Sequence, residues 1–157
     1  TMGMEAAQTT FQVLSGQLKS ALQSGGVQNA VDYCNIHAYP LTDSLSEHLN
    51  AKIKRVSLQY RNPNNKPDST EIEAIVVMQQ QRLSNEKMTP QVIEQGDKMR
   101  FFAPIVTQAL CLNCHGVPGE QISDADYAFI KEKYPDDMAI GFSEGDLRGI
   151  WSITFQK

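Results

Sequence analysis

The sequence predicts an α+β protein in which helices come first and a small antiparallel sheet follows. Two observations carry this prediction. The first fifty residues place apolar side chains at helical spacing, and the remainder alternates short apolar segments with turn residues and brief helices. The strand–helix alternation of a parallel sheet is missing. At 157 residues we expect one domain, 1–157, with helices over about 4–50 and a sheet core over about 51–157.

Two helices are expected in the N-terminal part. The first runs from about Met4 to Ser24, where Ser24-Gly25-Gly26 ends it. The second runs from about Val27 to Leu49 and keeps the same apolar periodicity. Pro40 lies inside this second helix, so we expect a kink or a split there.

The next segment reads as a strand, a loop and a third helix. Residues 52–60 alternate apolar and polar side chains, as a strand does. Residues 61–68 are rich in Pro and Asn and predict a loop. A helix over about 71–83 follows, for which Ser69 or Thr70 is the expected N-cap.

The C-terminal half supplies most of the predicted sheet. Residues 91–106 are expected to form a hairpin that turns at Gln95-Gly96-Asp97. A short helix is expected over about 123–134. Strands over 138–142 and 147–155 then close the chain.

Composition excludes two classes of partner. The formal net charge is −4 and the basic residues form no cluster, so nucleic acid is not an expected partner. No apolar run approaches the length of a membrane span, so a membrane is expected only through a removed anchor, if any.

One short stretch dictates chemistry: Cys111-Leu112-Asn113-Cys114-His115. C-x-x-C-H is the attachment signature of a c-type haem, in which both thiols form thioethers and the His is the proximal ligand of the iron. A zinc site is the rival interpretation, but it needs further soft ligands and only Cys34, His37 and His48 remain. A thioredoxin-like pair would follow a strand of a βαβ unit, a pattern that is absent. We expect one covalent haem c.

Haem c is attached outside the cytoplasm, so an exported, periplasmic location is expected. Residues 1–3, Thr1-Met2-Gly3, read as a cloning remnant on a trimmed chain whose missing part was an export signal or anchor. Cys34 is then a lone thiol in an oxidising compartment, which is unusual.

The second axial ligand has several candidates. On general grounds Met or His comes first, and a Cys thiolate is the minority choice. Cys34 also fits a small buried apolar residue, and His37 or His48 a partly exposed helical residue. The remaining candidates are the methionines Met2, Met4, Met78, Met88, Met99 and Met138.

Several motifs occur together along the chain. They are Tyr33-Cys34-Asn35; Arg55-Val56-Ser57-Leu58; Arg61-Asn62-Pro63-x-Asn65-x-Pro67 with Glu71; Cys111-Leu112-x-Cys114-His115-Gly116; Tyr134-Pro135-x-Asp137-x-Ala139-x-Gly141; and Gly145-Asp146-Leu147-Arg148-Gly149. In combination they resemble the haem c-binding, PAS-like extracytoplasmic domain family over about residues 25–157. That family occurs alone in bacterial periplasms and as the sensing part of membrane-bound kinases and chemoreceptors.

The resemblance implies a PAS-like antiparallel sheet with N-terminal and flanking helices, one covalent haem and His/Cys axial ligation. It places the distal ligand on Cys34, opposite the proximal His115 of the C-x-x-C-H motif, while His37 stays open as the alternative distal ligand on general grounds. Haem propionates are carboxylates, which Arg binds bidentately, so Arg61 or Arg55 is a candidate partner beside a simpler role as a solvated loop residue. Arg100 and Arg148 lie in predicted strands and are equally open.

The leading functional prediction is a periplasmic monohaem protein that senses redox state or a small diatomic ligand and acts on a downstream signalling output. Thiolate ligation favours ferric iron, and release of Cys34 on reduction would open a site for CO or NO. The alternative is a soluble electron-transfer cytochrome c with a redox partner protein. An enzyme such as a peroxidase needs a distal acid–base pair, and no candidate pair is evident, so we do not expect an enzyme.

Overall fold

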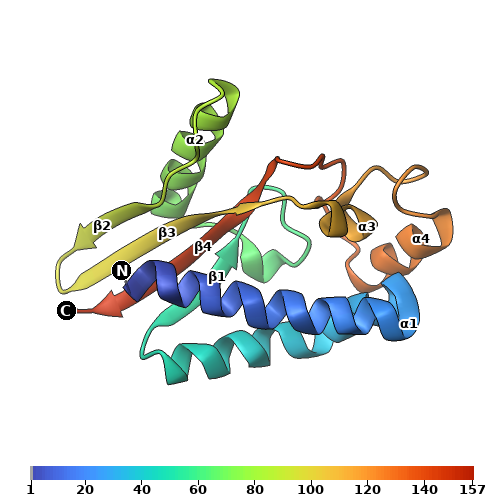
Figure 1. Cartoon of the computed structure of the whole chain (residues 1–157), viewed down its shortest axis with the longest axis horizontal. Helices are drawn as coiled ribbons and strands as arrows, with labels where there is room; N and C mark the ends of the chain where they lie inside the picture. The colour runs from blue at the N-terminus through green and yellow to red at the C-terminus, as the bar shows by residue number, and fades with distance from the viewer. Residues whose placement is uncertain (1) are drawn as a thin grey trace.

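The computed structural model describes residues 2–157 as a four-stranded antiparallel sheet between a long helical hairpin and a shorter helix (Figure 1). The elements follow in the order α1 (Met2–His48), β1 (Lys52–Val56), the 3-10 helix η1 (Pro63–Asn65), α2 (Ser69–Leu83), β2 (Gln91–Gln95), β3 (Lys98–Val106), the 3-10 helix η2 (Ala109–Cys111), α3 (Leu112–His115), α4 (Asp124–Lys133) and β4 (Leu147–Gln156). The predicted α+β class is confirmed. Thr1, in the supposed cloning remnant, lies outside the described residues.

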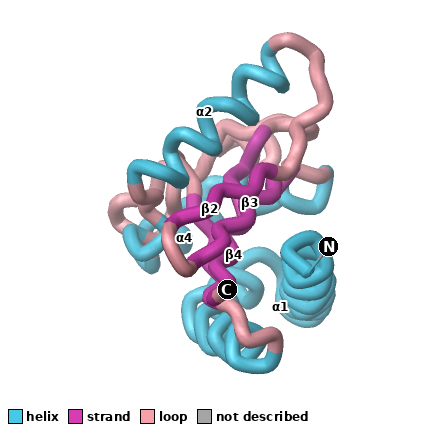
Figure 2. The backbone as a smooth tube through the Cα atoms, turned by 90° about the vertical axis from the view of Figure 1, so that its left-hand side faces the viewer, coloured by secondary structure: helices cyan, strands magenta, loops and turns pink. Residues whose placement is uncertain are grey.

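The sheet has the strand order β1-β4-β3-β2, and every neighbouring pair is antiparallel. Figure 2 shows α1 and α2 on opposite sides of this sheet. Each face therefore has its own apolar core. The core on the α1 side contains Ala6, Ala7, Ile53, Phe101, Ala103, Trp151 and Ile153. The core on the α2 side contains Val56, Ala74, Ile75, Met78, Phe102, Leu147 and Ile150.

The two predicted N-terminal helices are the two arms of α1. Its only non-helical dihedral angles are at Gly25 (φ −159°, ψ 16°) and Gly26 (φ 72°, ψ −163°), where the chain reverses. Gly26 occupies a region of backbone space that is essentially restricted to glycine. The predicted split at Pro40 is not observed. Buried Ala38 and Thr42 hold the helix on either side of Pro40, and the Thr42 hydroxyl donates to the Ala38 carbonyl at 2.8 Å.

The N-cap of α2 is Asp68, so the prediction of Ser69 or Thr70 was wrong. The Glu71 N–H donates to Asp68 Oδ1 at 2.9 Å, and the Asp68 N–H donates to Glu71 Oε2 at 2.8 Å. This reciprocal capping box satisfies two N–H groups that a cap at Ser69 would leave without partners.

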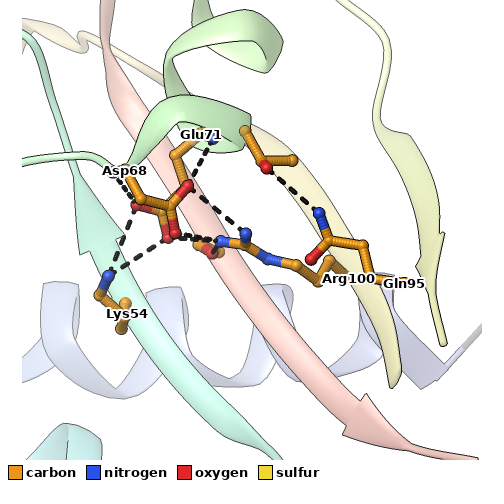
Figure 3. Close-up of polar contacts among 7 residues, drawn as sticks. Lys54, Asp68, Glu71, Gln95 and Arg100 are labelled. Atoms are coloured by element: carbon orange, nitrogen blue, oxygen red, sulfur yellow. Dashed lines mark hydrogen bonds and ion pairs between the residues drawn. The ribbon is translucent and has the colours of Figure 1, made fainter. Parts of the chain in front are cut away.

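Buried Glu71 also joins α2 to the sheet (Figure 3). Its carboxylate accepts from Lys54 on β1 at 3.3 Å and from Arg100 on β3 at 2.9 Å. Arg100 also donates to Asp68 at 2.9 Å. Two cations therefore compensate the buried charge of Glu71, as a carboxylate removed from water requires.

Two strand predictions need correction. Residues 138–142 are not a strand, because their N–H groups serve other segments: Gly141 donates to Gly116 at 2.8 Å and Phe142 donates to His115 at 2.9 Å. The strand predicted over 52–60 ends at Val56, because the Ser57 N–H turns to the Asn65 carbonyl at 3.1 Å. Among the helices of residues 2–157, none combines the length and apolar character needed to span a membrane.

Candidate cofactor site

The Cys111–His115 segment folds as a short helical run directly after β3. The 3-10 turn η2 passes into α3, which ends where the Gly116 N–H donates to the Leu112 carbonyl at 3.0 Å. Side chains three residues apart lie on one face of a helical turn, so Cys111 and Cys114 share a face. Both are half-buried free thiols. The sequence spacing therefore gives two thiols that can reach one edge of a ligand.

His115 is held in one tautomer. Its Nδ1 lies 2.8 Å from the Ala139 carbonyl, which accepts only, so Nδ1 carries the proton and donates. Removal from water, followed by the positive charges of Arg148 and Arg61, holds the pKa of His115 well below 6.5. The imidazole is therefore neutral, with a free lone pair on Nε2. This is the arrangement of a metal-ligating histidine whose other nitrogen is oriented by a backbone carbonyl.

Arg61 holds the C-x-x-C-H motif in place through a hydrogen bond to its backbone. One terminal nitrogen, Nη2, donates to the carbonyl of Cys114 at 2.6 Å and to that of Ala139 at 3.1 Å. Its Nε donates to Asp137 at 3.0 Å, and the Asp137 side chain is fully buried. Arg61 thus fixes both the end of the motif and the carbonyl that orients His115. Its predicted contact with a propionate stays a prediction, and these nitrogens already have protein acceptors.

Two elements hold Cys34 opposite the motif. The second arm of α1 packs on α4 through Val31, Ile130 and Tyr134, and α1 also contacts α3. Cys34 lies one turn after Val31 and is half-buried. An ionised Cys34 would raise the pKa values of Cys114 and Tyr134, so these side chains lie near one another.

Burial governs the chemistry of the thiols. It raises the pKa of Cys34, and the positive charges of Arg55 and Arg61 oppose this rise. Burial likewise raises the pKa of Cys114 to about 11. Both thiols are protonated at neutral pH until bond formation or metal coordination displaces the proton.

Both candidate histidines and Met78 lie away from the motif. His37 is exposed, packs against the Tyr33 ring at 5.0 Å and lines a shallow groove between the two arms of α1. His48 is exposed at the end of α1. Met78 is fully buried in the core on the far side of the sheet. Met138 lies between Asp137 and Ala139, but it is 41% exposed, whereas Cys34 is half-buried and lies near Cys114.

A protein-only metal site is not built. Within residues 2–157, the structure assembles no group of three or more His, Cys, Asp or Glu side chains that could hold a metal ion. The donor set at the motif is two thiols on one face, a neutral imidazole and a thiol from a facing helix. This set suits a cofactor that brings its own metal and forms covalent links.

The segment after α4 was missed as part of the site. Asp137 and Ala139 orient His115 and Arg61 from a stretch that was predicted to be a strand. Pro135 lies just before this stretch and Gly141 within it, at φ 78°. Both residue types disfavour regular strands, so they could have argued against the predicted strand. No local signal in the sequence points to a role for the Ala139 carbonyl.

Fold and site together define a class: an α+β sheet protein that presents one C-x-x-C-H segment opposite a cysteine on an N-terminal helix. The chain belongs to the Tll0287-like family, which matches residues 2–156. This confirms the relationship inferred from the combined motifs. The fold is similar to a crystal structure described as the cyanobacterial heme-protein Tll0287. The TM-score is 0.72 and the identity 28%, over 98% of this chain and 92% of that one. No curated protein matches the chain.

Proposed function

We propose that this protein binds one haem c covalently through Cys111 and Cys114, with His115 Nε2 and Cys34 Sγ as axial ligands. The observation that carries the proposal is the hydrogen bond from His115 Nδ1 to the Ala139 carbonyl, because it prepares Nε2 for iron. Similarity to a protein described as a heme-protein supports it. The iron, when bound, supplies one-electron redox chemistry.

The chain's own residues define what that chemistry is used for. Thiolate coordination by Cys34 stabilises ferric iron and lowers the potential. Cys34 would be held less strongly by reduced than by oxidised iron, because reduction lowers the positive charge that attracts the thiolate, and its sulfur would then be more easily protonated. Release of Cys34 would free the second arm of α1 on that side of the site. We therefore favour a redox or diatomic-gas sensor whose partner is a downstream signalling output.

Electron transfer to a redox partner protein is the second candidate. Asn113, inside the motif, is exposed, so this segment of the site reaches the surface where a partner can approach. Ligand exchange on reduction distinguishes the two candidates, because a carrier keeps both ligands in both states. In either case we propose an exported, periplasmic location, and neither role requires an enzyme activity.

The central experiment is acid–acetone extraction of the protein produced in the periplasm together with a haem c attachment system. We expect the haem to stay on the polypeptide and the intact mass to exceed that of the bare chain by one haem. Cys111→Ala with Cys114→Ala should abolish this attachment, whereas the matched control Cys34→Ala should keep it. Complete extraction of the colour from the parent protein would refute the proposal.

A further inference from the structure

Three guanidinium groups act on His115. Arg148 on β4, Arg61 in the loop after β1 and Arg55 on β1 each lower its pKa through their positive charge. Within residues 2–157, the only ion pair made by any of the three joins Arg61 to Asp137. The site therefore holds an excess of two positive charges that the described part of the protein does not neutralise.

Arg61 is already committed to the protein. Its side chain is 11% exposed and donates to the Asp137 carboxylate and to two backbone carbonyls. Replacing those acceptors by a ligand would uncover the buried charge of Asp137. Arg61 is thus a positioning residue, and the two charges in excess belong to Arg55 and Arg148.

A bulge in β4 sets the direction of Arg148. Ile105 pairs with Gly149, but Val106 pairs with Leu147, so Arg148 is the extra residue between them. Bulges of this kind re-aim a side chain beside functional sites. The guanidinium lies 5.2 Å from the ring centroid of Phe142, which itself meets His115 edge-on at 6.3 Å.

Arg148 lacks a counter-charge. It donates once, from Nη1 to the Gln59 carbonyl at 3.2 Å. Burial, with the charges of Arg61 and Arg55, lowers the pKa of Arg148 to about 9. A guanidinium that is taken from water beside two others gains most from a carboxylate.

Arg55 faces the same space from β1. It pairs with Trp151 in the sheet register, on the face that packs against α1. Within residues 2–157 the Arg55 side chain makes no hydrogen bond or ion pair, although its charge acts on the pKa values of Cys34 and Tyr39. It also borders the 770 Å³ groove between α1 and β1. The Arg55 guanidinium is therefore free to bind a carboxylate close to Cys34.

We infer that Arg55 and Arg148 each bind one carboxylate of the same ligand, the two propionates of the haem, while Arg61 positions the motif. Two guanidinium groups without counter-charges match two carboxylates in number and sign. Both guanidinium groups are close enough to His115 to act on its pKa, and Arg55 also acts on that of Cys34, so both lie near the proposed cofactor site. This inference rests on the proposed function.

The test uses the ferric holoprotein. Arg55→Gln and Arg148→Gln should each shift a propionate bending band in the resonance Raman spectrum and lower the reduction midpoint. Lys87→Gln is the control, because it removes one positive charge at an exposed position outside the groove that Arg55 borders. Arg55→Lys and Arg148→Lys should keep the midpoint near that of the parent but still shift the Raman band, since the bidentate fork is lost.

The outcomes separate the two proposals. Parent protein without covalent haem overturns both. If the loaded Arg55→Gln and Arg148→Gln variants show the same Raman bands and midpoints as Lys87→Gln, this inference is overturned and the proposed function stands. Should a Gln variant fail to load haem, a crystal structure of the parent holoprotein decides. Propionates within hydrogen-bond reach of Arg55 and Arg148 support the inference, and propionates out of reach of both refute it.

Discussion

At the scale of single residues, the site is set by a few oriented polar groups. The Ala139 carbonyl accepts from both His115 and Arg61, so one backbone oxygen fixes the tautomer of the histidine and the place of the guanidinium. Arg61 in turn connects Asp137 to the carbonyl of Cys114. Displacing any of these groups moves the imidazole, because they share acceptors and donors.

Cys34→Ala should change the ferric Soret band and the EPR spectrum while the haem stays attached, because it removes the proposed distal ligand. His37→Ala is the matched control from the next turn of the same helix, and its spectra should equal those of the parent. The opposite pattern, with unchanged spectra in Cys34→Ala and altered spectra in His37→Ala, would assign the ligand to His37.

Asp137→Asn should lower the free energy of unfolding by about 3 kcal/mol, because it leaves the nearly buried Arg61 without its counter-charge. Urea unfolding measures the change. Glu94→Gln serves as the control, since it breaks the exposed pair with Lys157 and should leave the unfolding curve in place. Equal effects of the two substitutions would show that the buried pair has no special weight.

At the scale of elements, the reversal of α1 determines which arm carries the ligand. Both arms contact the sheet core, the first through Ala6 and Ala7 and the end of the second through Leu45 and Leu49. The second arm also packs on α4 and carries Cys34. The reversal at Gly25 and Gly26 therefore lets the start of the second arm follow the cofactor site while the rest of the hairpin stays on the sheet.

Gly26→Ala should destabilise the protein by about 1–3 kcal/mol, because alanine does not tolerate the Gly26 backbone at φ 72° and ψ −163°. Gly16→Ala is the matched control in the first arm, where an added Cβ meets open space. It should stabilise the helix by about 0.5–1 kcal/mol. Thermal unfolding of both variants provides the comparison, and a stabilising Gly26→Ala would contradict the account of the reversal.

The cap of α2 should make stability depend on acid pH. Burial alone would raise the pKa of Asp68, but the hydrogen bonds from Arg100 and the Glu71 N–H, with nearby positive charge, bring it below 3.8. A lowered pKa contributes stability above the unfolded value, roughly pH 4, which is lost as the pH falls through the folded value. Asp68→Asn keeps a capping oxygen and removes the charge. In urea titrations its stability should therefore fall less steeply than that of the parent below pH 4.

Local signals explain which elements the sequence could predict. The hairpin of β2 and β3 was found because its turn is marked by Gly96, which has φ 60°. The end of the first helical arm was predicted from the Gly25-Gly26 pair for the same reason. Residues 138–142 were mistaken for a strand because their hydrogen bonds go to the motif, more than twenty residues earlier. The local pattern of apolar and polar residues does not reveal such distant hydrogen-bond partners.

The residues of the site also fall into those that the local sequence predicts and those that only the structure reveals. Cys111, Cys114 and His115 form a contiguous motif, so their chemistry can be read from spacing alone. The ion pair between Arg61 and Asp137 joins residues 76 positions apart, and the loop composition around Arg61 pointed equally well to solvent. Only the folded chain brings long-range partners and backbone acceptors together. For this reason the support that Arg61, Asp137 and Ala139 give to the motif was identified only in the structure.

At the scale of the whole molecule, a His/Cys site predicts a low-potential protein with a labile distal bond. The reduction midpoint should lie clearly below that of a Met/His cytochrome c, and CO should bind the reduced protein. Cys34→Met should raise the midpoint, because a thioether replaces a thiolate. A high positive midpoint in the parent together with no CO binding would leave the electron carrier as the better account.

Both ends of the described chain lie at the same end of the molecule, away from α3 (Figure 1). Gly3 packs against the Phe101 ring, and the Lys157 N–H donates to Asp97 in the turn between β2 and β3 at 2.8 Å. A tag on either terminus would therefore tether the protein to an electrode with the C-x-x-C-H end turned toward the solution. Direct electron exchange with that electrode should be slow, whereas a cysteine introduced at exposed Glu120, in the loop after α3, would bring the C-x-x-C-H end close to the electrode and shorten the tunnelling path.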